Sequence, residues 1–169
     1  MEWYVVFVET GKEENIQKWL SFHFSKDILH SLVPKRRLTI KNNGKTYKIL
    51  KKLFPGYVFV CTEMDIDKYK KIRSIPKLIR ILNTGTYYTK IDEREMDIIL
   101  KLVGNDDIVD YSKIFIENSR VCVKDGPLCG MEGIIRKVDK HKNRARIELN
   151  FMGELRTIDV GVEILYSIA

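Results

Sequence analysis

The chain has 169 residues, enough for one ordinary domain or two small ones, and 44% of them are hydrophobic, which excludes a disordered or fibrous protein. No apolar run approaches the roughly 18 residues that a membrane span needs, and the N-terminus lacks a secretory signal pattern, so we expect a soluble, cytoplasmic monomer with no membrane partner. The net charge of +7 favours an anionic partner.

The first elements alternate between strand and helix. Residues 3–8 have the pattern of a buried strand, and Thr10 with Glu13 fits a capping box that opens a helix. That helix would bury one apolar face, made of Ile16, Trp19, Leu20 and Phe24. Asn43-Gly44 lies between two alternating runs, 38–40 and 47–49, and predicts a β-hairpin with a type I′ turn.

The next strand covers residues 54–61, and a second helix covers 67–74, where Pro76 limits its length. A short strand follows at 78–82, and a third helix starts at Asp92 and stops at Gly104. Strands that alternate with helices predict an α/β sandwich whose sheet is covered by helices on one side.

The pattern changes after residue 104. Residues 105–117 are rich in acidic side chains and are interpreted as a linker, whereas 118–169 contain four short strands, 120–124, 133–138, 145–149 and 155–160. Strands this close together leave no room for a helix and predict a small β-barrel. The fold class is therefore α+β, with an α/β domain at 1–104, an acidic linker at 105–117 and a barrel at 118–169.

Positive charge is concentrated in the first domain. No carboxylate occurs between Asp27 and Glu63 or between Asp67 and Asp92, although both stretches are rich in Lys and Arg. Two long acid-free stretches favour a surface for a polyanion, and a merely solvated basic surface is the alternative. The chain shows no nucleophile elbow, phosphate-binding glycine loop or zinc spacing among its three cysteines and three histidines. We expect no enzyme activity, no metal and no cofactor.

Three motifs in order resemble the NusG family of transcription elongation factors: Trp3-Tyr4-Val5-Val6, Phe54-Pro55-Gly56-Tyr57-Val58, and the KOW pattern Val123-Lys124-Asp125-Gly126-Pro127-Leu128 followed by Gly133-Ile134-Ile135. The resemblance covers nearly the whole chain. It implies an N-terminal NGN-type α/β sandwich and a C-terminal SH3-like KOW barrel.

The resemblance also implies a partner for the first domain, RNA polymerase, bound through the clamp helices of its largest subunit. The matching positions are Phe7, Phe54, Pro55, Tyr57 and Phe59. Tyr57 and Phe59 share one sheet face, and if helices cover only the valine face, the aromatic face is left open. On periodicity alone, core is the favoured interpretation of these rings, and the family resemblance favours the open face instead.

The barrel of this family recruits other factors, commonly ribosomal protein S10 or a termination factor. The matching apolar residues are Phe151 and Met152, and barrel core is the alternative. The chain departs from the family at Gly153-Glu154, where Gly-Arg is typical. It also has Ser74-Ile75-Pro76-Lys77 where many members have Asn-Thr-Pro-Gly beside non-template DNA.

These departures favour a specialised paralog that acts as an antiterminator at selected operons and is recruited by a structured leader RNA. The candidate nucleic-acid contacts are Lys35, Arg36, Arg37, Lys51, Lys52, Lys71, Arg73 and Lys77. Non-specific affinity for nearby DNA is an alternative role for them. A housekeeping elongation, pausing or termination factor and a general KOW-type RNA-binding protein are the alternative functions.

Overall fold

A computed structural model of the chain describes residues 1–81, 83–84 and 87–166. The chain forms two compact units. Unit 1 consists of Met1–Val33 and Phe54–Met96, and unit 2 consists of Pro34–Leu53 and the chain from Asp97 onward. None of the helices in these described ranges is both long and apolar enough to cross a membrane.

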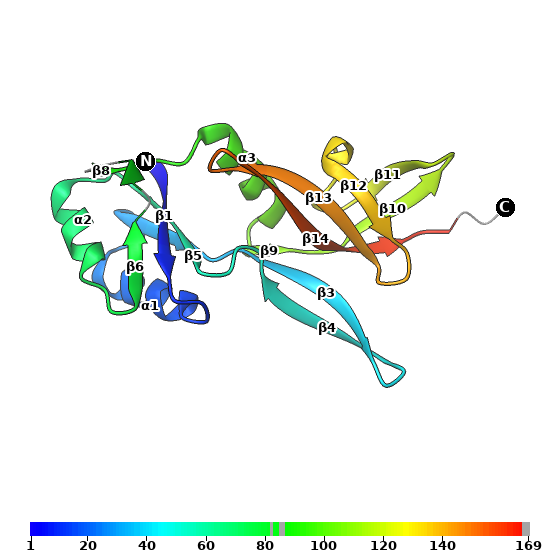
Figure 1. Cartoon of the computed structure of the whole chain (residues 1–169), viewed down its shortest axis with the longest axis horizontal. Coiled ribbons are helices and arrows are strands. Elements are labelled where there is room, and N and C mark those ends of the chain that lie inside the picture. The colour runs from blue at the N-terminus through cyan, green and yellow to red at the C-terminus, as the bar shows by residue number, and fades with distance from the viewer. Residues whose placement is uncertain (82, 85–86, 167–169) are drawn as a thin grey trace. The chain divides into compact units, whose positions relative to one another are not determined.

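Unit 1 is built on a four-stranded antiparallel sheet, shown with its helices in Figure 1. The strand order is β2 (Leu29–Leu32), β5 (Tyr57–Thr62), β1 (Glu2–Val8) and β6 (Leu78–Ile81). The helices are α1 (Glu13–His23), α2 (Ile66–Arg73) and α3 (Glu93–Val103), the last of which starts in unit 1. Two short strands, β7 (Asn83–Thr84) and β8 (Tyr87–Tyr88), pair with each other. The predicted strand at 78–82 includes residue 82, which lies outside the described residues.

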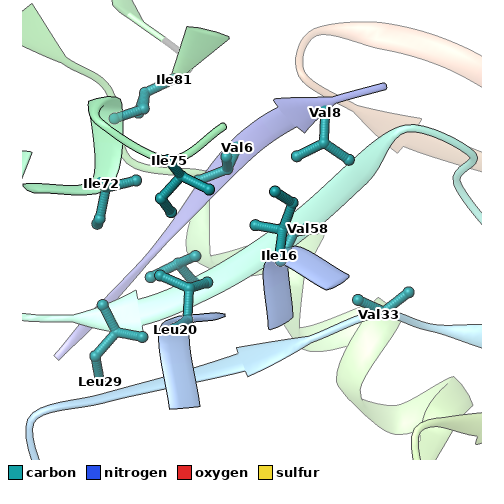
Figure 2. Close-up of a cluster of buried hydrophobic side chains, with 11 residues drawn as sticks. Val6, Val8, Ile16, Leu20, Leu29, Val33, Val58, Ile72, Ile75 and Ile81 are labelled. Carbon is teal, nitrogen blue, oxygen red and sulfur yellow. The ribbon is translucent and has the colours of Figure 1, made fainter. Parts of the chain in front are cut away.

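The core of unit 1 lies on the valine face of the sheet. Val6 and Val8 of β1 and Val58 and Val60 of β5 pack with apolar residues of α1, α2 and the loops, and most of this cluster is labelled in Figure 2. Alternation along each strand places these valines on one side, because successive side chains point to opposite faces. The prediction that helices cover the valine face is confirmed.

The starts of α1 and α3 differ in how they are capped. Asp92 accepts hydrogen bonds from the backbone N–H groups of Arg94 (2.9 Å) and Glu95 (3.4 Å), so the predicted start of α3 is correct. The predicted capping box at Thr10 is wrong, because Lys12 occupies the N-cap position of α1 and makes no side-chain cap. Glu13 is buried and is used for other hydrogen bonds, described below.

Unit 2 contains the predicted hairpin, β3 (Lys35–Asn42) and β4 (Lys45–Lys52), which Figure 1 shows as a two-stranded ribbon. Asn43 and Gly44 have φ angles of 50° and 75°, which are both positive, as a type I′ turn requires. The short strand β9 (Ile108–Val109) pairs in parallel with the first residues of β3. The hairpin prediction is therefore confirmed.

The rest of unit 2 is a five-stranded sheet, called the C-terminal sheet. Its order is β11 (Arg120–Asp125), β10 (Ser112–Glu117), β14 (Glu154–Ile164), β13 (Arg144–Phe151) and β12 (Ile135–Asp139), with a single 3₁₀ turn at Glu132–Ile134. The first eight residues of β14 pair with β13 and its last three pair with β10, as in the strongly curved sheet of a small barrel.

Residues 105–117, predicted to be an acidic linker, hold strands β9 and β10. Their carboxylates are used locally: Asp106 and Asp110 accept hydrogen bonds from the backbone N–H groups of Ile108 and Tyr111. The interpretation as a linker did not include these two strands, because short strands of mixed polarity do not stand out from a charged linker in sequence. The boundary between compact units also falls elsewhere, since the hairpin groups with the C-terminal sheet.

Candidate functional site

An aromatic cluster forms where β5 begins. The ring of Tyr57 lies edge-on to Phe7 of β1 at 5.0 Å and parallel to Phe54 at 6.1 Å, measured between ring centroids. Phe54 in turn meets Phe59 at 5.6 Å, and the guanidinium of Arg80 lies 4.3 Å from the centroid of Phe7. The four predicted aromatic residues are thus brought together on one side of the sheet.

The exposure of this cluster differs from the prediction of an open face. Phe7, Phe54 and Phe59 are 7%, 3% and 0% exposed, so the prediction is wrong for these three rings. Edge-to-face and stacked contacts among these rings and Tyr57 cover part of their surface. Tyr57 is half-buried and Pro55 is exposed, so these two residues form the accessible part of the cluster.

A buried carboxylate fixes the turn that precedes Tyr57. Glu13 Oε1 accepts a hydrogen bond from the backbone N–H of Gly56 (2.8 Å), and Oε2 accepts one from Gly11 (2.9 Å). Gly56 has a φ of +83°, and a Cβ atom there would lie 3.2 Å from the carbonyl oxygen of Val8. Sequence reasoning assigned Glu13 to a capping box and missed this role, because its partner Gly56 is 43 residues away.

The predicted nucleic-acid residues separate into two groups. Lys71, Arg73 and Lys77 are exposed in unit 1, at the end of α2 and in the following loop. The hairpin group, Lys35, Arg36, Arg37, Lys51 and Lys52, lies in unit 2. In the hairpin register, Lys35 lies opposite Lys52 and Arg36 opposite Lys51. Like charges placed directly opposite are destabilising, so this hairpin start carries concentrated positive charge at a cost in stability.

The two hairpin arginines are engaged inside unit 2. Arg36 Nη1 donates to the carbonyl oxygen of Asp159 on β14, and Arg37 Nε lies 3.3 Å from Asp110 Oδ1. Burial lowers the pKa of Arg36 and positive Arg144 lowers it further, while Asp159 opposes both effects. Arg36 therefore links the hairpin to the C-terminal sheet, and Arg37 links it to the segment between β9 and β10.

The predicted partner site on the C-terminal sheet is mostly core. Phe151 is 0% exposed, and Arg156 places its guanidinium 5.4 Å from the centre of the ring. Met152 has a φ of +54° in the turn between β13 and β14 and is half-buried. The interpretation of Phe151 as a core residue is the one that fits this burial, because alternation in β13 points it inward with Leu149 and Ile147.

No group of three or more His, Cys, Asp or Glu side chains that could hold a metal ion is found among residues 1–81, 83–84 and 87–166. The described residues offer charged and aromatic surfaces, which are features typical of protein and nucleic-acid interfaces.

Comparison with solved structures defines the class of fold. The chain is similar to the structure described as "Domain interaction in Thermotoga maritima NusG", with a TM-score of 0.61 and 23% identity over 95% of this chain and 93% of that one. The α/β fold of unit 1 and the strand-rich C-terminal part are therefore shared with that structure.

Sequence comparison gives the family. The family model "Transcription termination factor nusG" matches residues 1–100, which is more than half of the chain. Proteins named "Transcription termination/antitermination protein NusG" are similar throughout: that of Neisseria meningitidis is 26% identical over 94% of this chain and 93% of its own length, and that of Escherichia coli is 26% identical over 94% and 91%. The chain belongs to the NusG family of transcription factors.

Lys77 gives a first testable prediction. Its φ is +69°, at the position where the motif resemblance places glycine. A left-handed conformation costs an L-residue about 1–2 kcal/mol, and glycine costs about 0.5–1 kcal/mol in chain entropy. We therefore expect Lys77→Gly to raise the free energy of unfolding by about 0.5–1 kcal/mol in urea titrations.

The control is Lys77→Ala, which keeps the strained conformation and loses only the exposed ion pair between Nζ and Glu9 Oε2 at 3.5 Å. It should bring no gain in stability. A rise of equal size in both variants would show that the backbone conformation is not the cause.

Proposed function

We propose that this protein binds RNA polymerase through the aromatic cluster and modulates transcript elongation, with processive antitermination at selected operons as its main effect. Membership of the NusG family supports the general activity. The single observation that carries the contact is the accessible pair, Tyr57 and Pro55, on a base of buried aromatic rings. A rigid aromatic side chain on a packed base is typical of the anchor residues of interfaces.

Binding to core RNA polymerase tests this contact. Tyr57→Ala removes the accessible ring and should weaken binding at least tenfold. Truncation of an interface anchor of this kind typically costs roughly 2 kcal/mol or more of binding free energy. Binding is measured by fluorescence anisotropy of the labelled protein titrated with core polymerase, without nucleic acid.

The matched control is Tyr47→Ala on strand β4, where the side chain is 46% exposed. It should bind as the native chain does. If Tyr57→Ala and Tyr47→Ala both bind as the native chain does, the aromatic cluster is not part of the interface with polymerase.

The proposal includes recruitment by a structured leader RNA, supported by the concentration of positive charge on the hairpin. Housekeeping termination is the second candidate function, because the similar curated proteins are named for both termination and antitermination. Transcription in vitro on two templates, one with an intrinsic terminator and one with a factor-dependent terminator, separates the two. Increased read-through supports antitermination, and increased release of transcript at a factor-dependent terminator supports the second candidate.

A further inference from the structure

A basic groove lies where the hairpin meets the C-terminal sheet, entirely within unit 2. It has a volume of about 300 Å³ and is lined by Thr39, Ile40, Lys41, His141, Lys142 and Arg144. The hairpin supplies the first three residues, and the turn between β12 and β13 with the start of β13 supplies the others. Three of the six lining side chains are cationic, and none is a carboxylate.

Contacts between the hairpin and the sheet hold the walls of this groove together. Lys41 Nζ donates to the carbonyl oxygen of His141 (3.2 Å), and the hydroxyl groups of Thr39 and Tyr111 lie 2.7 Å apart. Gly161 of β14 allows the close approach, because a Cβ atom there would collide with the carbonyl oxygen of Arg37 and with the ring of Tyr111. The groove is therefore a built feature of unit 2.

Positive charge gathers at Arg144 in the groove wall and at Arg36, which is close enough to Arg144 for the two charges to interact. The Nε atoms of Arg36 and Arg144 are buried, and neither has a hydrogen-bond partner within the described part of the chain. Two carboxylates lie on the adjoining surface: Asp159 pairs with Arg146 at 3.1 Å, and Asp139 accepts the backbone N–H groups of His141 and Lys142. Clustered cations of this kind repel one another unless an anion neutralises them.

We propose that this groove binds the phosphodiester backbone of a nucleic-acid strand, with Lys41, Lys142 and Arg144 as its phosphate contacts. The inference rests on the nucleic-acid recruitment in the proposed function and assigns its residues. Lys41 and Lys142 are exposed, and Arg144 is half-buried in the groove wall. Such contacts position a strand and do not read bases.

The test measures binding of two labelled probes in the absence of polymerase: a 20-base-pair RNA hairpin and a DNA hairpin of the same sequence. The variant Lys41→Gln/Lys142→Gln removes two exposed charges without touching buried structure. We expect its affinity to fall about tenfold at 0.15 M salt, and the slope of log K against log salt to decrease by about 2.

The matched control is Lys113→Gln/Lys124→Gln, which removes two exposed lysines from β10 and β11 and leaves the same net charge. It should change affinity less than twofold. Equal weakening in both variants would show that the general positive charge of the protein, and not the groove, binds the probes. Absence of binding by the native chain to both probes would also contradict the proposal. Tighter binding to the RNA probe than to the DNA probe would identify RNA as the nucleic acid that the groove binds.

A third variant changes the groove without changing charge. Gly161→Val forces the hairpin away from β14 and should weaken probe binding, while circular dichroism checks that the strands remain folded. Unchanged binding by a folded Gly161→Val would overturn the joint role of hairpin and sheet. Polymerase binding is measured in a separate assay. A negative result for Tyr57→Ala would therefore not contradict the groove proposal, and a negative result for the groove would not contradict the polymerase contact.

Discussion

Replacing Gly126 with Ala should destabilise unit 2 by about 3–5 kcal/mol, the largest single effect that we expect in this chain. Gly126 has a φ of +103°, and a Cβ atom there would lie 2.6 Å from Cα of Ser112 and 2.7 Å from the carbonyl oxygen of Tyr111. Both obstacles are backbone atoms, so no side-chain rotation can relieve the collision. The turn is also tied down, because Ser112 Oγ accepts a hydrogen bond from the buried N–H of Leu128 (2.9 Å).

Hydrogen exchange at the amides of β13 measures this effect, since Ala145 and Ile147 are fully buried in the same sheet. The control is Gly130→Ala, which also has a positive φ (+77°) but has no atom within 4 Å of a built Cβ. It should lower the free energy of unfolding by about 1 kcal/mol, which is the effect of the left-handed conformation alone. Equal losses of protection in the two variants would show that steric collision at Gly126 is not the dominant cause.

Replacing Glu13 with Ala should destabilise unit 1 by about 2–4 kcal/mol. The substitution removes the acceptor for the buried N–H of Gly56, and a buried donor without a partner costs about 1–3 kcal/mol. The hydrogen bond from Gly11 is only partly buried and Gly11 is an exposed residue, so most of the loss comes from the buried bond of Gly56. Urea unfolding followed by tryptophan fluorescence is the measurement, because Trp3 and Trp19 both lie in unit 1.

Two controls define the cause. Glu13→Gln keeps one acceptor oxygen and should cost about half as much, whereas Lys18→Ala changes an exposed position on the same helix and should have little effect. Because Glu13 fixes the turn before Tyr57, Glu13→Ala should also weaken polymerase binding. Equal stability of Glu13→Ala and the native chain would contradict the structural role of this carboxylate.

Local patterns predicted most of the elements because their causes lie within a few residues of one another. Asn43-Gly44 defined the hairpin through the positive φ angles of its turn, and Asp92 marked the start of α3 through its hydrogen bonds to the next turn. Alternation in β1 and β5 separated the valine face from the aromatic face. These signals require no knowledge of distant parts of the chain.

The candidate sites were predicted less completely. The positions of the aromatic cluster were identified, but periodicity says which residues share a face and not whether that face is covered, so the burial of Phe7, Phe54 and Phe59 was missed. The positive charge of the hairpin indicated Arg36 and Arg37 as nucleic-acid contacts, but both guanidinium groups contact other residues of unit 2. The groove residues Lys41 and Lys142 were overlooked because they are about 100 positions apart in sequence.

The sequence by itself determined the three helices, the hairpin, several of the other strands and the family, because local conformational preference and short motifs are properties of neighbouring residues. Tertiary structure alone decided that Glu13 bonds Gly56, that residues 105–117 form strands, and that the hairpin and the C-terminal sheet enclose a basic groove. The physical reason is that burial, steric fit at Gly161 and the summed charge of Lys41, Lys142 and Arg144 depend on which distant segments meet, and chain order does not record that.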